Sequence, residues 1–114
     1  MDVLLNPETV VQKQVDAYNA HQLDQFLSFY THDAAIVRLR EEVVVARGIS
    51  EIRTFYKRLF DNSPALKCEI AQRMVFGDCV IDKEQITGHF TKGDFTATAV
   101  YEVVGNLIRK VWFI

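Results

Sequence analysis

Residues 95–103 read FTATAVYEV, and this stretch decides the fold. Its odd-numbered positions are apolar: Phe95, Ala97, Ala99, Tyr101 and Val103. Its even-numbered positions are mostly polar, with Thr96, Thr98 and Glu102 among them. Alternation with a period of two is typical of a β-strand that has one face on a core and one face in water. The sequence therefore predicts a strand whose odd face points inward.

Turn signals flank this strand on both sides. Gly77-Asp78, Lys92-Gly93 and Gly105-Asn106 each separate two runs of strand-forming residues. With Lys92-Gly93 as the turn, Phe90 lies opposite Phe95, Gly88 opposite Ala97 and Ile86 opposite Ala99. Two of these pairs, Gly88/Ala97 and Ile86/Ala99, are small, and they either leave space for a cavity or let a helix pack closely; both interpretations stay open. The strands expected in this antiparallel meander are 66–76, 79–90, 95–104 and 107–114.

The first half of the chain has helical signals. Asn6 is expected to cap a helix that begins at Pro7 and ends near residues 19–21. A second apolar stripe runs from Leu23 to Tyr30, and Ser50 is expected to cap a third helix that stops at 62–64. A hairpin formed by residues 34–39 and 42–47 is expected between the second and third helices. Helices grouped apart from an antiparallel sheet predict one α+β domain over residues 1–114.

Bulk composition excludes several classes of protein. Apolar residues make up 49% of the 114 residues, enough for a core, and 13 basic residues balance 15 acidic ones. That balance gives no electrostatic case for nucleic acid. No stretch has the ~18 apolar residues of a membrane helix, and residues 1–7 lack a secretory leader pattern, so a cytoplasmic protein is expected. Cys68 and Cys79 are expected to be free thiols, and no histidine spacing indicates a metal or cofactor site.

Four local motifs resemble those of one family. They are VDAYNAHQLD at 15–24, FYTHDAA at 29–35, GISEIRTFY at 48–56 and VVGNLI at 103–108. In this order they resemble the SnoaL-like and ketosteroid-isomerase-like proteins of the nuclear transport factor 2-like superfamily. The resemblance implies a cone-shaped α+β barrel with three N-terminal helices on a curved, mainly antiparallel sheet. It also implies a small apolar ligand at the open end and a homodimer formed through the outer sheet face.

The catalytic groups of ketosteroid isomerase do not carry over by this resemblance. Gln14 stands at the position of its tyrosine, Arg38 at that of its carboxylate base, and Ala99 at that of its aspartic acid. Arginine does not accept a proton near neutral pH, so that mechanism is rejected. Tyr30 and Tyr56 match the family's pocket tyrosines. The acidic sets of related epoxide hydrolases and polyketide cyclases are also missing, which leaves Asp82 or Glu84 as candidate acid or base.

Each candidate residue has a functional and a structural interpretation. Arg38 either holds an anionic ligand group or forms a salt bridge. Asp82 and Glu84 are either catalytic carboxylates or an ion-pair cluster with Arg73, which pairs across from Asp82. His89 is expected on the polar outer face. The residues expected to bind ligand, some of which are alternatively core residues, are Gln14, Tyr18, Tyr30, Arg38, Tyr56, Phe90, Phe95, Ala99 and Tyr101.

Three functions are compatible with these residues. The first is a domain that binds a small apolar ligand carrying a carbonyl or acid group. The second is a SnoaL-type isomerase, cyclase or hydrolase acting on a small cyclic or polyketide-like substrate, with Glu84 or Asp82 as base. The third is a protein–protein adaptor, which would need an exposed apolar patch beyond the dimer surface.

Overall fold

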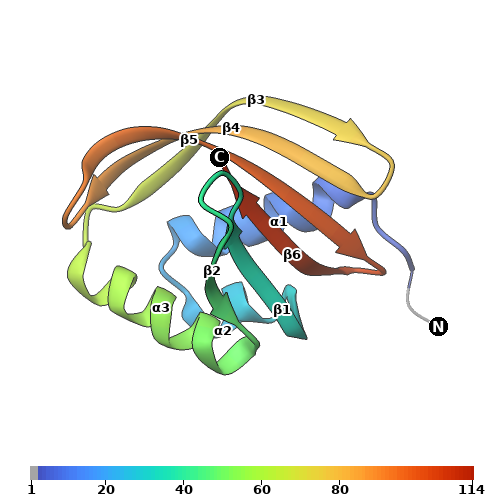
Figure 1. Ribbon diagram of the computed structural model, residues 1–114, viewed down its shortest axis with the longest axis horizontal. Helices are drawn as coiled ribbons and strands as arrows, with labels where there is room; N and C mark the ends of the chain where they lie inside the picture. Colours follow the sequence, from blue (N-terminus) through green and yellow to red (C-terminus); the bar gives the residue numbers. More distant parts are fainter. Residues whose placement is uncertain (1–2) are drawn as a thin grey trace.

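Three helices cover the concave face of one six-stranded sheet in the computed structural model, which describes residues 3–114 (Figure 1). Residues 1 and 2 of the start discussed above lie outside the described residues. The α+β class is confirmed. The helices are α1 (Pro7–Asn19), α2 (Leu23–Leu27) and α3 (Ile49–Asn62). The strands are β1 (Tyr30–Arg38), β2 (Val43–Arg47), β3 (Lys67–Phe76), β4 (Cys79–His89), β5 (Gly93–Val104) and β6 (Leu107–Phe113).

The sheet is mixed rather than simply antiparallel. Its strand order is β2-β1-β6-β5-β4-β3, and β3 to β6 form the expected antiparallel meander. β1 and β6, however, pair in parallel. Turn signals reveal only pairs of neighbouring strands, so this long-range pairing left no local trace in the sequence. The expectation of three N-terminal helices also needs correction, because α3 follows the β1–β2 hairpin.

The inward face of β5 is as the alternation predicts. Ala99, Tyr101 and Val103 are buried, while Val104 and Thr96 are exposed. The predicted register against β4 is wrong. Ile86 pairs with Phe95 and Asp82 with Ala99, a slip of four residues from the expected pairs. A slip by an even number of residues keeps every side chain on its predicted face, so the inward-facing residues of β5 were predicted correctly despite the wrong register.

The slip arises because the β4–β5 connection is longer than a two-residue turn. β4 ends at His89, residues 90–92 make the turn, and the pairing is irregular between Ile86 and His89. Gly88 has a φ of +76° there, and a Cβ on it would lie 2.3 Å from the carbonyl oxygen of Ala65. Only glycine fits such a close approach in this backbone conformation.

Three details at the element ends differ from expectation. Asn6 makes no side-chain cap; instead its carbonyl oxygen accepts from the backbone N–H of Thr9. Helix α3 begins at Ile49, so Ser50 lies inside it and Gly48 occupies the capping position. Tyr30 starts β1 instead of ending α2, because its neighbours in the parallel pairing with β6 extend the strand.

Aromatic side chains join the helices to the sheet. Phe26 of α2 is fully buried and lies with ring centroids 4.6 Å from Tyr56 of α3 and 5.2 Å from Tyr30 of β1. Replacing such a ring with alanine typically costs about 3–5 kcal/mol. Through Phe26, the short helix α2 therefore packs between α3 and the sheet and helps to set their relative position.

Asn19 fastens α1 to the edge strand β3. Its side-chain amide donates to the carbonyl oxygen of Cys68 (2.9 Å) and accepts from the Cys68 backbone N–H (2.7 Å). These two bonds imitate a strand pairing at an edge that would otherwise be open. They hold Cys68 under the helices. Both cysteines are free, as expected. Among residues 3–114, the helices are too short and too polar for any of them to cross a membrane.

Candidate functional site

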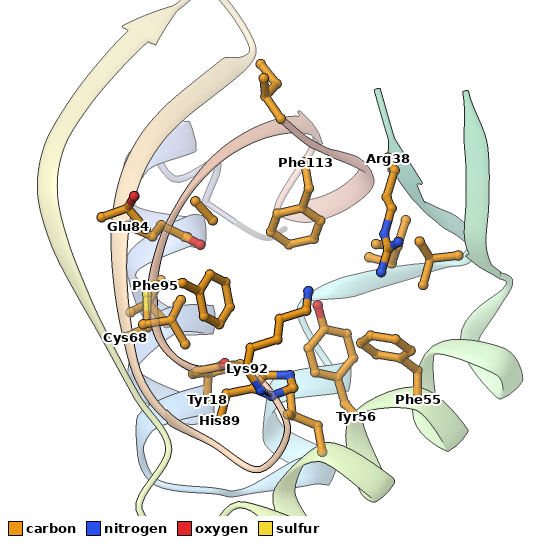
Figure 2. Close-up of a pocket in the computed structure, with 18 of the residues that line it drawn as sticks. Tyr18, Arg38, Phe55, Tyr56, Cys68, Glu84, His89, Lys92, Phe95 and Phe113 are labelled. Atoms are coloured by element: carbon orange, nitrogen blue, oxygen red, sulfur yellow. Dashed lines mark hydrogen bonds between the residues drawn. The ribbon is translucent and has the colours of Figure 1, made fainter. Parts of the chain in front are cut away.

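A cavity of about 360 Å³ lies between the concave sheet face and helices α1 and α3. We call it the chamber. Its buried end is lined by Gln14, Cys68, Glu84 and Tyr101, and its exposed end by Arg38, Glu41, Phe55 and Lys92. Figure 2 shows Glu84 and Phe95 on one wall, with Arg38 approaching from the opposite side. The chamber is thus polar at its two ends and apolar between them.

Glu84 is the titratable group at the buried end. Its side chain comes from β4, only 4% of the residue is exposed, and its Oε2 accepts a hydrogen bond from the Tyr101 hydroxyl (2.9 Å). Burial raises the pKa of Glu84 to about 7. The Tyr101 hydrogen bond opposes this rise, Asp82 adds to it, and Arg73 and Cys68 oppose it. A carboxyl group with this pKa exchanges a proton readily near neutral pH.

Asp82 has a different environment although it lies on the same strand face. It is fully buried, and both its oxygens accept from Arg73, with Nε–Oδ1 at 2.7 Å and Nη2–Oδ2 at 2.8 Å. The remaining Arg73 nitrogen, Nη1, donates to Gln12. The predicted pairing of Arg73 opposite Asp82 is confirmed. Asp82 does not line the chamber, so it takes the ion-pair role and leaves Glu84 as the buried carboxylate that faces the cavity.

A bulge in β3 changes which residues face inward along that strand. Ile70 pairs with Glu84 and Gln72 with Lys83, so Ala71 is the extra residue between them. Before the bulge, Cys68 and Ile70 face inward. After it, the inward position falls to Arg73, while Met74 and Val75 are exposed. The sequence left this register open, because period-two patterns cannot show where a bulge interrupts them.

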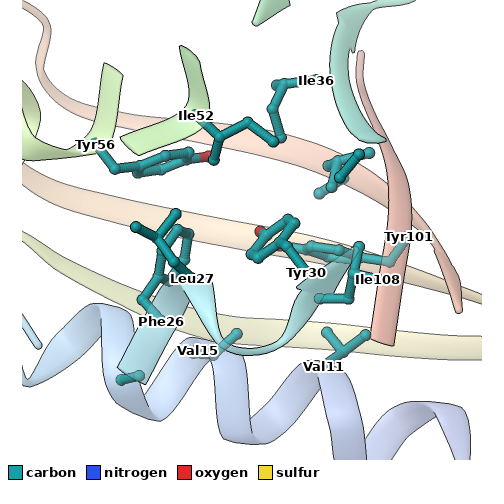
Figure 3. Packing of buried hydrophobic residues seen from close by; sticks show 14 of the residues in the cluster. Val11, Val15, Phe26, Leu27, Tyr30, Ile36, Ile52, Tyr56, Tyr101 and Ile108 are labelled. Atoms are coloured by element: carbon teal, nitrogen blue, oxygen red, sulfur yellow. The ribbon is translucent and has the colours of Figure 1, made fainter. Parts of the chain in front are cut away.

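Three of the four candidate tyrosines line the chamber: Tyr18, Tyr56 and Tyr101. Burial raises the pKa of each well above its usual value, so all three keep their hydroxyl protons and can donate hydrogen bonds. Tyr30 does not line the chamber. It lies in the buried cluster near Ile108 (Figure 3) and donates to Gln14 Oε1, which holds the Gln14 side chain in place.

The other predicted binding residues divide into two groups. Phe95 lines the chamber, and so does Arg38, whose side chain is exposed at the mouth. Ala99 is buried beneath the chamber without lining it. Phe90 lies outside the chamber, in a neighbouring groove beside α3. Within residues 3–114, Arg38 has no carboxylate at salt-bridge distance.

Two cationic or titratable residues at the mouth were missed. His89 was expected on the outer sheet face, and that prediction is wrong: His89 and Lys92 both line the chamber. The irregularity at Gly88 shifts the alternation by one residue and turns His89 inward. A glycine within a strand pattern was the available signal, since isolated glycines often mark bulges. In the described part of the chain, no three metal-ligating side chains lie together.

Comparisons with known proteins agree with this architecture. The model of the SnoaL-like domain family matches residues 11–111. A cystatin fold protein from Novosphingobium aromaticivorans, described as uncharacterized, is 28% identical, with a TM-score of 0.88 over 96% of this chain and 98% of that one. No curated protein matches the sequence.

Two further solved structures share the fold at low identity. A putative polyketide cyclase from Sinorhizobium meliloti has a TM-score of 0.80 at 17% identity, covering 93% of this chain and 94% of that one. An NTF2-like protein of unknown function from Cytophaga hutchinsonii has a TM-score of 0.82 at 10% identity, covering 100% and 93%. At these identities the likeness shows the fold and nothing finer.

Proposed function

The chain belongs to the SnoaL-like domain family, and from that premise we propose that the chamber binds a small, largely apolar ligand carrying a carbonyl or carboxylic acid group. The observation that carries this proposal is the space itself. Phe90 and Phe95 could have filled the cavity, but Phe90 lies outside it and Phe95 forms only a wall, leaving about 360 Å³. Cavities above ~300 Å³ with few convergent polar groups are typical of ligand sites.

The polar groups at the buried end favour an oxygen-bearing ligand. The Tyr18 and Tyr56 hydroxyls line the chamber with no carboxylate hydrogen-bonded to them in residues 3–114, so each can donate to a ligand oxygen. Glu84 in its protonated form is a third donor. A ligand oxygen that receives such bonds recovers the hydrogen bonding it had in water, which an apolar cavity alone would not supply.

A fluorescent probe tests the binding proposal. N-Phenyl-1-naphthylamine is neutral and apolar, and we expect it to bind with enhanced emission. Ala97 lines the chamber, so Ala97→Phe should fill the cavity and weaken binding at least tenfold. Ala20→Phe makes the same change at an exposed position outside the chamber and serves as the matched control. Equal binding by both variants would show that the dye sits elsewhere and would overturn the proposal.

Glu84 supports a second candidate function, proton transfer at carbon next to a carbonyl. It is the buried carboxyl group that faces the cavity without an arginine partner, and its pKa is about 7. As a base, its carboxylate would take a proton from the α-carbon. The C–H electrons would form the enolate C=C bond while the carbonyl π electrons move to oxygen, where a tyrosine hydroxyl stabilises the charge. The proton would then return from Glu84 to carbon.

Isotope exchange tests this second function. α-Tetralone is an apolar cyclic ketone, and we expect the protein to accelerate exchange of its α-protons in D₂O, followed by NMR. The rate should rise with pH and level off above about pH 7, because the active form of Glu84 is deprotonated. Glu84→Gln should abolish the acceleration, whereas Glu69→Gln, an exposed change on β3, should not. Acceleration that survives Glu84→Gln would eliminate Glu84 as the base.

A further inference from the structure

A second cavity lies beside the mouth of the chamber. It is a groove of about 680 Å³ beside α3 and the β4–β5 turn, and we call it the outer groove. The residues that line both spaces are Arg38, Val45, Phe55, Leu59, His89 and Lys92. These shared residues place the groove directly beside the chamber mouth, within reach of a ligand that extends out of the chamber.

Several basic side chains line the outer groove. Arg38, Arg58 and Lys92 line it, and within residues 3–114 none has a carboxylate at salt-bridge distance. Its acidic residue, Glu51, uses Oε1 to accept from the Arg47 backbone N–H at 2.9 Å. The other nearby carboxylate, Glu41, lies at the chamber mouth. Positive charge therefore predominates at the point where the two cavities meet.

Aromatic rings hold two of these cations in position. The Arg58 guanidinium lies 5.5 Å from the Phe90 ring centroid, and the Lys92 ammonium lies 5.2 Å from that of Phe95. Cation–π contacts restrain flexible side chains at a small energetic gain. Part of the entropic cost of ordering them around an anion is thereby removed before binding.

His89 lines both the chamber and the outer groove. Its ring stacks on Phe90 with centroids 5.2 Å apart, and its Nδ1 accepts from the backbone N–H groups of Thr91 and Lys92, both at 3.1 Å. These bonds fix the β4–β5 turn and so fix the position of Lys92. They also explain the place of Phe90, which belongs to the groove rather than to the chamber.

We propose that the ligand is an elongated amphiphile with an apolar head in the chamber and an anionic tail, a carboxylate or a phosphate ester, in the outer groove. This rests on the proposed binding function and adds the chemical class of the ligand. The tail is recognised by Arg58 and Lys92, with Arg38 at the junction. Guanidinium groups bind both kinds of oxyanion in a fork geometry, whereas the lysine contributes a point charge.

Three ten-carbon compounds separate head binding from tail binding. Decanol, decanoate and decyl phosphate share one alkyl chain, which stands for the apolar head, and differ in the charge of the terminal group, which stands for the tail. Each is measured by displacement of N-phenyl-1-naphthylamine. On the native protein we expect decanoate to bind more tightly than decanol, and added salt to weaken decanoate only. If decyl phosphate gains most over decanol, the groove favours the dianion; if decanoate gains most, it favours the carboxylate.

Charge-neutral variants supply the decisive comparison. Arg58→Gln and Lys92→Gln should each weaken decanoate about two- to fivefold, as expected for exposed ion pairs, and the double variant about tenfold. Decanol should bind all of them as it binds the native chain. Lys13→Gln with Lys83→Gln is the matched control, since it removes the same charge from exposed sites away from both cavities.

Failure of the tail inference can be distinguished from failure of the proposed binding function. If the double variant weakens decanol and decanoate equally, or the control pair weakens decanoate as much, the groove does not recognise the tail and the inference is wrong. If N-phenyl-1-naphthylamine binding is insensitive to Ala97→Phe, the chamber itself is not the ligand site, and the proposed function fails with it.

Discussion

Replacing Glu84 with glutamine should make the protein more stable at alkaline pH. The ordinary pKa of a glutamic acid is 4.5, and burial raises that of Glu84 to about 7 in the folded state. Between these values the folded chain holds a proton that the unfolded chain has released. Stability then falls as pH rises, because the slope of the unfolding free energy follows the protons bound by the unfolded state minus those bound by the folded state.

The size of this effect follows from the two pKa values. Each pH unit of separation corresponds to about 1.4 kcal/mol, so full ionisation of Glu84 costs about 3 kcal/mol of unfolding free energy. Part of that cost is already present at pH 5, and most of it should appear between pH 5 and pH 8. The cost stops growing above pH 7, once the folded-state group is ionised. Glutamine stays neutral throughout and can still accept from Tyr101.

The assay is urea unfolding of both proteins at several pH values, followed by the fluorescence of Trp112. The difference between Glu84→Gln and the native chain should be small at pH 5 and should grow in favour of the variant up to about pH 8. Other titrating groups cancel in this difference. Glu69→Gln, whose carboxyl is exposed, should show no such trend. A difference that stays constant across this range would refute a raised pKa for Glu84.

Three further predictions concern the frame around the site. Arg73→Met should cost about 3–5 kcal/mol of unfolding free energy in urea, because it leaves the fully buried Asp82 charge unpaired, and adding Asp82→Leu should recover most of the loss. Gly88→Ala should cost more than about 2 kcal/mol in the same assay, whereas Gly77→Ala, which has open space around it, should cost about 1 kcal/mol. We expect the chain to dimerise through the outer sheet face, so Thr98→Arg should lower the dimer fraction measured by analytical ultracentrifugation, and an unchanged fraction would place the interface elsewhere.

Local periodicity predicted much of the framework. The alternation around Ala99 and Tyr101 gave the inward face of β5, and the turn at 77–78 gave the pairing of Arg73 with Asp82. These features depend on residues close together along the chain, where hairpin geometry fixes the register. The parallel pairing of β1 with β6 joins residues far apart along the chain, such as Tyr30 and Ile108, which are 78 positions apart (108 − 30), and no local pattern encodes it.

Irregular backbone accounts for most of what sequence reasoning missed. Gly88 interrupts β4 and brings His89 and Lys92 to the chamber mouth, which turned a predicted outer-face histidine into a lining residue. Phe90 moved for the same reason, from the expected chamber wall to the outer groove. A single extra residue inverts the faces of everything after it, so one unrecognised bulge misplaces several side chains together.

The chemistry of the chamber follows from which cross-strand neighbour each carboxylate meets. Asp82 and Glu84 are two residues apart on one face of β4, yet Asp82 faces Arg73 whereas Glu84 faces Ile70 and Ala97. The turn at 77–78 sets Arg73 opposite Asp82, and the unpaired residue Ala71 then shifts the register so that Ile70, rather than Ala71, lies opposite Glu84. The arginine neutralises one carboxylate within the framework, and the other, surrounded by apolar side chains and a hydroxyl, keeps its proton up to about neutral pH.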